Sequence, residues 1–224
     1  MLKIDNVSYR YKNSGRDVLK SISAEFVGGK VHAVVGPSGS GKTTFLSIMA
    51  GLDEPTSGTV LIDGDDLSTL DLDLYRRERI SMIFQAFQLF PLLTALENVC
   101  TPMQLNGEDH IVSRLKAKSA LESVGIDSSK HKRYPSNLSG GEQQRVAIAR
   151  SLTSGARVIL ADEPTGNLDQ ANGEVVMSIL TQLAHEQGYC VIVVTHNPEL
   201  AEASDVIFRM NDGILSTQSD EKTM

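Results

Sequence analysis

The sequence predicts an α/β fold with a mostly parallel sheet, an N-terminal antiparallel β subdomain and an inserted α-helical lobe. Apolar strand candidates at 30–35, 157–161 and 190–195 alternate with helical stretches at 44–50 and 173–186. This alternation is typical of parallel sheets joined by crossover connections. Shorter segments with alternating apolar residues precede the first of these strands, and they favour antiparallel pairing.

Length and composition are those of a globular chain with one large core. The 224 residues are 41% hydrophobic, with a formal net charge of −7. We expect one domain over 1–224, in which 1–85 and 156–224 form the core and about 86–155 the helical lobe. The negative charge argues against a nucleic-acid partner, which usually needs a basic face.

Neither the cysteines nor the apolar runs indicate a metal site or a membrane span. Cys100 and Cys190 are isolated and are interpreted as small buried hydrophobes. The N-terminus has no apolar signal core, and no run approaches the roughly 18 to 20 residues that cross a bilayer. We therefore expect a soluble, cytoplasmic protein whose membrane role, if it has one, comes through a partner.

The first third of the chain contains the antiparallel candidates. Apolar residues punctuate 4–11, a turn at 13–15 follows, and 18–27 is a second strand. A further strand at 59–62 precedes a turn at Asp63-Gly64.

Later signals delimit the lobe and the C-terminal strands. A strand is expected at 79–85, and Thr94 with Glu97 forms a capping box that starts a helix. Helical stretches at 111–124 and 138–152 follow, and Asn197 begins a short helix after the last core strand. Asn211-Asp212-Gly213 between 205–210 and 214–217 is a hairpin signal, and 219–224 is a polar tail.

One stretch matches the phosphate loop of nucleoside triphosphatases, Gly-x-x-x-x-Gly-Lys-Ser/Thr. Its glycines allow backbone N–H groups to curl around phosphate oxygens. Lys42 would reach the β- and γ-phosphates and the Thr43 hydroxyl would ligate Mg²⁺. We therefore expect a P-loop NTPase core whose nucleotide-binding residues are Gly36, Ser38, Gly39, Ser40, Gly41, Lys42, Thr43 and Thr44.

Two carboxylates follow a buried strand, at the sheet edge where open α/β folds bind ligands. Asp162 suits Mg²⁺, which takes one or two carboxylates beside phosphates. Glu163 could orient or deprotonate an attacking water. An ordinary strand end with solvated acids remains the alternative for the pair taken alone.

A second anion-binding element is predicted at 138–142, Leu-Ser-Gly-Gly-Glu. Ser139 and Glu142 form a capping box, so a well-capped helix is the simpler reading. However, Gly140 and Gly141 weaken a helix start by about 1 kcal/mol each, which suggests close approach of a ligand to the backbone. Two phosphate-facing elements in one chain suggest that a two-fold dimer shares them.

The ordered set of motifs resembles the ATP-binding-cassette (ABC) transporter ATPases over essentially the whole chain. The set comprises the phosphate loop, Gln85 after a strand, the signature 138–141, the acidic pair 162–163, Asn167-Leu168-Asp169, and His196 after the last core strand. The resemblance implies an ATPase that uses ATP and Mg²⁺ and forms a homodimer on binding ATP.

The resemblance also implies individual roles. Gln85 would touch Mg²⁺ and the attacking water, and His196 would contact the γ-phosphate. With Lys42 and Glu163 these form the candidate catalytic set, and Thr43, Gln85 and Asp162 form the metal set. Trans contacts across the dimer are implied for Ser139, Gly140, Gly141 and Glu142, and an interface position for Asp169.

The adenine contact has two candidates. Tyr9 and Tyr11 fall on one face of a predicted strand, and packing is the alternative for either. We choose Tyr11, because its distance from the phosphate loop fits the family better. The other histidines, His32, His110, His131 and His185, show no ligand spacing.

Within the family, 91–99 and 160–169 resemble the macrolide-exporter, lipoprotein-release, antimicrobial-peptide-export and cell-division type. That group implies an integral membrane permease with few helices and a large extracytoplasmic domain. The ATPase would bind this permease at the inner face of the cell membrane. The apolar cluster 87–93 is either a surface that docks this partner or internal core of the lobe. The complex of ATPase and permease would serve in export, extraction or extracytoplasmic signalling.

Two rival classes fit less well. An ABC-type ATPase of nucleic-acid processing would carry a long coiled coil or a second cassette, and a phosphoryl-transfer kinase would lack the 138–141 signature. The transported substrate is not visible in this sequence, because a permease on another chain would select it.

Overall fold

Alternating apolar residues near the N-terminus build an antiparallel sheet. The computed structural model describes residues 1–12 and 15–217. The predicted antiparallel strands are present, whereas the turn at 13–15 lies partly, and the tail 219–224 wholly, outside the described residues. The sheet has the order β2-β1-β4-β5, with β1 (Leu2–Tyr9), β2 (Leu19–Phe26), β4 (Ser57–Ile62) and β5 (Asp65–Asp66).

The strongly apolar segments form a second, mostly parallel sheet, as predicted. Its order is β10-β9-β3-β8-β7-β6, and β10 runs antiparallel to β9 through the predicted hairpin. The strands are β3 (Lys30–Val35), β6 (Ile80–Phe84), β7 (Val158–Asp162), β8 (Cys190–Thr195), β9 (Val206–Asn211) and β10 (Ile214–Thr217).

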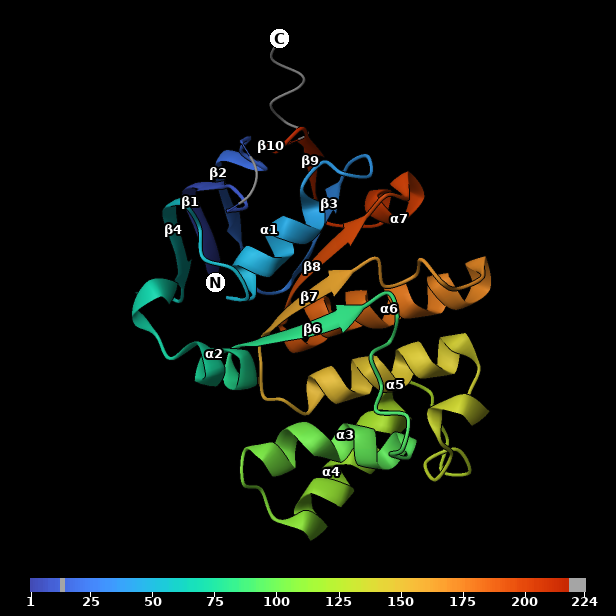
Figure 1. The fold of residues 1–224 in the computed structure, drawn as a ribbon. Coiled ribbons are helices and arrows are strands. Elements are labelled where there is room, and N and C mark those ends of the chain that lie inside the picture. The colour runs from blue at the N-terminus through green and yellow to red at the C-terminus, as the bar shows by residue number, and fades with distance from the viewer. Residues whose placement is uncertain (13–14, 218–224) are drawn as a thin grey trace.

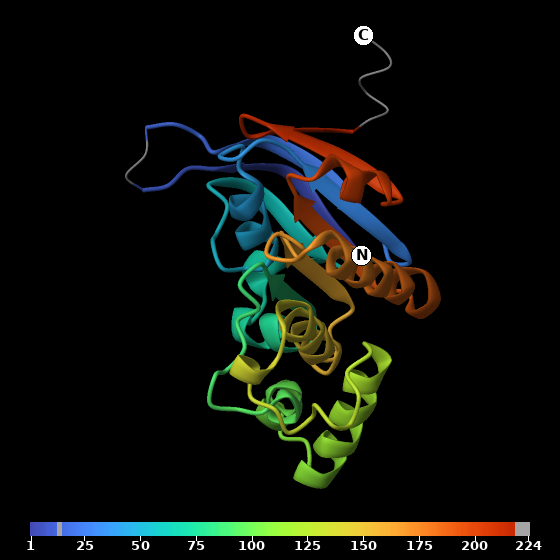
Figure 2. The ribbon, with the colours of Figure 1, turned by 90° about the vertical axis from the view of Figure 1, so that its right-hand side faces the viewer.

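Alternation along the central strands divides the interior into two cores. Ile192 and Val194 face one core, and Val191 and Val193 face the other, because successive side chains of a strand point to opposite faces. The first core packs α1 (Lys42–Met49) between the two sheets. Figure 2, turned by 90° from Figure 1, shows this layering from the side.

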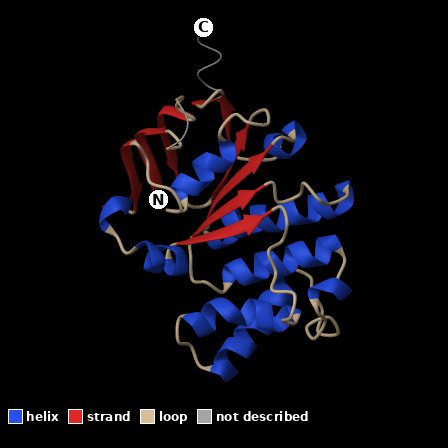
Figure 3. Ribbon diagram, viewed as in Figure 1, coloured by secondary structure: helices blue, strands red, loops and turns tan. Residues whose placement is uncertain are grey.

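The second core covers the opposite face of the parallel sheet. It is shared by α6 (Gln170–Gln187) and by three helices that lie in the chain between β6 and β7. These three form the lower part of the molecule in Figures 1 and 3 and are α3 (Ala95–Leu105), α4 (His110–Ser123) and α5 (Gly140–Leu152).

Two shorter helices and two helical turns complete the described part of the fold. The sequence analysis did not anticipate α2 (Leu72–Glu78), whose N-cap Asp71 accepts hydrogen bonds from the N–H groups of Asp73 and Leu74. The helix α7 (Pro198–Glu202) follows β8, as expected. The turns are η1 (Leu67–Thr69) and η2 (Pro135–Asn137). None of the helices within residues 1–12 and 15–217 has the length and apolar character that a membrane span requires.

Asn98 of α3 fastens the loop that leads from β6 into the helices. It has no solvent exposure, and its Oδ1 accepts a 2.8 Å hydrogen bond from the N–H of Phe90. Its Nδ2 lies 3.0–3.1 Å from the carbonyl oxygens of Phe90, Leu93 and Thr94, and two of these share one amide hydrogen. The Phe90 N–H and the Leu93 carbonyl oxygen have no other hydrogen-bond partner among the described contacts, so this amide satisfies both.

Replacing Asn98 by alanine should lower the free energy of unfolding by about 2 to 4 kcal/mol, because the Phe90 N–H and the Leu93 carbonyl oxygen lose their partner. Urea unfolding measures this. Asn106→Ala, at the exposed end of the same helix, should change it by no more than about 0.5 kcal/mol. Equal losses in the two variants would contradict the anchoring role.

Candidate functional site

The phosphate loop leaves β3 and enters α1, in the predicted strand–loop–helix context. Gly41, the N-cap of α1, has φ 107°, and Gly39 has φ 78°, both in the left-handed region that side chains disfavour. At Gly36 a Cβ would stand 2.1 Å from the carbonyl oxygen of Met210, so β9 packs directly on the loop. Each of these glycines is thus required by the backbone path.

Lys42 and Ser40 supply the polar interior of the loop. The Lys42 ammonium donates to the carbonyl oxygens of Gly36 and Pro37, both at 2.9 Å, and its side chain is 7% exposed. The Ser40 hydroxyl is buried and has no hydrogen-bond partner among the described residues. A buried cation and an unpaired hydroxyl in one loop suit an anionic ligand such as a triphosphate.

The two carboxylates stand beside this loop. Asp162 ends β7 and accepts a hydrogen bond from the Thr43 hydroxyl. Burial raises the pKa of the Asp162 carboxyl and the neighbouring Glu163 raises it further, whereas Thr43 and the Lys42 charge lower it. A carboxylate in contact with a threonine hydroxyl fits the donor set that Mg²⁺ takes beside phosphates.

Glu163 adopts a strained backbone. Its φ is 48°, a conformation that costs a non-glycine residue about 1 kcal/mol or more. Its N–H donates to the carbonyl oxygen of Val194 at 2.9 Å, which ties it to β8. Its Oε1 lies 2.8 Å from Nδ1 of His196, and the glutamate side chain is 15% exposed. The predicted water-activating acid and the predicted γ-phosphate contact are therefore hydrogen-bonded to each other.

Gln85 follows β6 and is held by a residue to which the sequence analysis gave no role. Its Nε2 donates to Oδ1 of Asn167 at 3.2 Å, and the Asn167 Nδ2 donates back to the Gln85 carbonyl oxygen at 2.9 Å. A Cβ at Gly166 would lie 2.8 Å from Gln85 Nε2. The segment that follows the acidic pair thus orients Gln85.

These groups line one open pocket of about 680 Å³. Gly36 and Ser40 lie outside its lining, and the signature residues and Asp169 are not part of it. The lining residues are Tyr11, Val18, Ser38, Gly39, Gly41, Lys42, Thr43, Thr44, Gln85, Asp162, Glu163 and His196.

The prediction that Tyr9 and Tyr11 share one face of a strand is wrong. Tyr9 ends β1 and is buried, whereas Tyr11 lies beyond the strand and is 47% exposed. Their rings meet edge to face with centroids 5.0 Å apart, so Tyr9 supports Tyr11. The Tyr11 hydroxyl is 2.9 Å from that of Thr44 in the phosphate loop. Only Tyr11 of the two borders the pocket.

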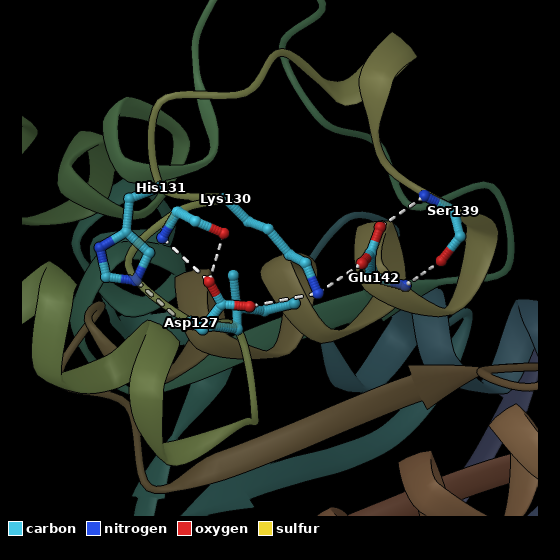
Figure 4. A network of polar contacts seen from close by, with 7 residues as sticks. Asp127, Lys130, His131, Ser139 and Glu142 are labelled. Carbon is cyan, nitrogen blue, oxygen red and sulfur yellow. Dashed lines mark hydrogen bonds and ion pairs between the residues drawn. The ribbon is translucent and has the colours of Figure 1, made fainter.

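The signature forms the N-terminus of α5. The predicted capping box is present: the Glu142 N–H donates to Ser139 Oγ at 3.3 Å, and the Ser139 N–H donates to Glu142 Oε2 at 2.8 Å. Figure 4 shows that Lys130 reaches the same glutamate from a neighbouring loop. Lys130 Nζ lies 3.0 Å from Glu142 Oε1 and 3.2 Å from Asp127 Oδ2.

These contacts favour the charged forms of the Glu142 and Asp127 carboxyl groups. The N–H of Ser139 lowers the pKa of Glu142, and Lys130 lowers it further. Hydrogen bonds from Ser129 lower the pKa of Asp127 to about 2, with a contribution from Lys130. Sequence reasoning missed Lys130, because its partners depend on the fold of the 125–138 segment.

The two signature glycines differ in the space that a side chain would have at each position. A Cβ at Gly141 would stand 2.2 Å from Oδ1 of Asn172 and 3.1 Å from its Cβ. Asn172 cannot move freely, because its Nδ2 bonds both carboxylate oxygens of Asp169, the N-cap of α6. A Cβ at Gly140 would meet only ordinary contacts, at 3.6 Å from Leu168 and Phe87. Packing within the chain explains Gly141 and leaves Gly140 unexplained.

The apolar cluster 87–93 divides between the two predicted alternatives. Leu89 packs against the second core, whereas Phe90 and Leu92 are 48% and 86% exposed. Phe90 lines a cleft of about 490 Å³ with Phe84 and Leu105, where β6 and α2 meet the helices α3 and α5.

Comparison with known proteins defines the family. Residues 19–166 match the ABC transporter family. The macrolide export ATP-binding/permease protein MacB of Escherichia coli K12 is 44% identical over 209 residues, which are 92% of this chain and 32% of MacB. The lipoprotein-releasing system ATP-binding protein LolD 2 of Rhodopirellula baltica is 42% identical, over 93% of this chain and 85% of LolD 2.

Solved structures agree. The dimeric bacterial ABC transporter cassette MJ0796 is 39% identical, with a TM-score of 0.87 over 97% of this chain and 98% of that one. A dimeric post-hydrolysis state of MJ0796, bound to ADP and phosphate, superposes with the same TM-score at 38% identity.

The chain therefore belongs to the ABC transporter family of ATP-binding proteins. It is an ATPase, which converts ATP to ADP and phosphate in coupling to transport. Within the family it matches the macrolide-export and lipoprotein-release group, as its motifs predicted.

The contrast between the two glycines gives a stability test. Gly141→Ala should lower the free energy of unfolding by about 1 to 3 kcal/mol, because its Cβ overpacks the Asn172–Asp169 contact. Gly140→Ala should leave it unchanged or raise it by up to about 1 kcal/mol through helix propensity. Urea denaturation of both variants checks this, and a larger loss at position 140 than at 141 would refute it.

Proposed function

We propose that the protein hydrolyses ATP in a head-to-tail dimer, in which the phosphate loop of one subunit and the signature of the other enclose each nucleotide. The observation that carries this proposal is that packing within the chain does not account for a glycine at position 140. Among residues 1–12 and 15–217 no contact requires a glycine there, and the signature stands outside the pocket that contains the other motifs. Similarity to MJ0796, whose structures are dimeric, supports the arrangement.

ATP occupies the pocket with its phosphates on the loop. The loop N–H groups and Lys42 bind the β- and γ-phosphates. Adenine stacks on the exposed ring of Tyr11, which Tyr9 supports from its edge. Thr43 and Asp162 would hold Mg²⁺, with Gln85 beside them in the pocket lining, and the cation would neutralise charge on the phosphate oxygens.

The residues that follow β6, β7 and β8 carry out the hydrolysis. Glu163 takes a proton from the attacking water while Gln85 orients that water against the γ-phosphorus. His196, hydrogen-bonded to Glu163, fixes the carboxylate before ATP arrives and then contacts the γ-phosphate. The strained backbone of Glu163 aims its side chain into the pocket.

The opposite subunit completes the site. Ser139 and the N–H groups of Gly140 and Gly141 approach the γ-phosphate at the positive end of α5. Glu142 keeps the cap in place through its bonds to Ser139 and Lys130. Asp169, exposed at the start of α6, lies across the interface.

The partner is an integral membrane permease that docks in the cleft lined by Phe84, Phe90 and Leu105. The cleft is largely apolar, and the exposure of Phe90 and Leu105 suits the apolar face of a partner helix. By analogy with the lipoprotein-releasing and macrolide-export relatives, this permease has few membrane helices and a large extracytoplasmic domain. The ATPase then works in the cytoplasm at the inner face of the membrane, in export, extraction or signalling.

Glu163→Gln should reduce ATP hydrolysis by about 10² to 10⁴-fold, because the amide cannot accept the proton of water. Nucleotide affinity should persist, so an ATP-bound dimer should accumulate and be detected by size-exclusion chromatography with light scattering. Glu122→Gln, the same change at an exposed position of α4, serves as the control and should hydrolyse normally. Wild-type turnover by Glu163→Gln would refute the role given to this carboxylate.

A further inference from the structure

The loop after Gln85 contains two consecutive residues in a disfavoured conformation. Phe87 has φ 59° and Gln88 has φ 50°, both in the left-handed region, although neither is glycine. The N–H of Gln88 donates to the carbonyl oxygen of Ala86 at 2.6 Å, which closes a tight turn. Such a turn persists only where the surroundings hold it.

Arg150 of α5 hydrogen-bonds to the backbone of this turn. Its Nη1 donates to the carbonyl oxygen of Gln88 at 2.6 Å, and its Nη2 donates to that of Phe87 at 3.3 Å. The guanidinium also lies 5.9 Å from the ring centroid of Phe90. Burial lowers the pKa of Arg150, but an arginine stays charged at any physiological pH. The planar fork matches two adjacent carbonyl groups, which a lysine cannot reproduce.

The pinned turn connects three parts of the molecule. Gln85, two residues before Phe87, lines the nucleotide pocket. The Phe87 ring comes within 3.6 Å of the place where a Cβ of Gly140 would stand, so it packs beside the signature. Gln88, Phe90 and Arg150 all line the cleft where β6 and α2 meet α3 and α5.

We propose that Arg150 is a positioning residue for hydrolysis, which fixes the Phe87–Gln88 turn so that Gln85 is presented to the nucleotide. The inference rests on the role proposed above for Gln85. Arg150 itself touches neither the pocket nor its other lining residues among the described contacts; it acts through the backbone of the loop.

Arg150→Lys keeps the charge and removes the fork. It should lower kcat by roughly ten- to a hundredfold with little change in KM, because a displacement of about 1 Å in a catalytic group can cost that much while ATP binding depends on the phosphate loop. Amide hydrogen exchange at residues 86–90 should become faster. Arg157→Lys is the matched control: Arg157 also donates to a carbonyl oxygen, that of Gln187, and lies 5.2 Å from the ring of Tyr189. It should keep wild-type kcat.

A double-mutant cycle separates this inference from the role of Gln85. If Arg150 acts through Gln85, Arg150→Lys should have little further effect on kcat in a Gln85→Ala background. A full reduction in both backgrounds would overturn the inference, as would wild-type kcat in Arg150→Lys, and either would leave the assignment of Gln85 standing. Wild-type kcat in Gln85→Ala alone would overturn the assignment of Gln85 and, with it, the inference. Thermal melts and ATP titration of each variant distinguish these outcomes from loss of the fold.

Discussion

The register of four parallel strands determines where the chemistry can occur. Phe84 pairs with Asp162, Asp162 with Val194, and Thr195 with Val35, so the ends of β6, β7, β8 and β3 form one row. The residues that follow this row are Gln85, Glu163, His196 and Gly36. Side chains distant in sequence therefore emerge at one sheet edge, the edge at which open α/β folds bind ligands. A slip of one residue in any strand would turn its group away from the pocket.

Polar groups at this edge are arranged so that few are neutralised within the chain. In the part of the chain that the structure describes, Lys42 bonds only to carbonyl oxygens of its own loop, and the pKa of Asp162 is raised by burial and by Glu163. A triphosphate with a divalent cation would satisfy both, since phosphates pair with the ammonium and the cation with the carboxylate. The strained Glu163 and the strained turn at Phe87–Gln88 lie in the same region, where backbone strain is often kept for function.

Local sequence predicted the elements that carry their own signal. The phosphate loop, the apolar strands and both capping boxes depend on neighbouring residues, and their structures are as expected. The sequence did not reveal α2, a short polar helix marked only by the Asp71 cap. Nor could it separate Gly140 from Gly141, because the difference lies in Asn172, far along the chain. The contacts of Gln85 with Asn167 and of Arg150 with the 87–88 turn are likewise tertiary, and no spacing rule encodes them.

The claim that two subunits share each nucleotide is tested most directly with mixed dimers. Gly140→Asp should bind ATP but fail to hydrolyse it, because a carboxylate meets the partner's triphosphate; Lys42→Ala should fail at the phosphate loop. Mixing the two inactive variants creates dimers with one intact composite site and one doubly damaged site. A one-to-one mixture should recover up to about a quarter of the wild-type hydrolysis rate, since half the dimers are mixed. Wild-type hydrolysis by Gly140→Asp alone, or a mixture no more active than its components, would contradict the shared site.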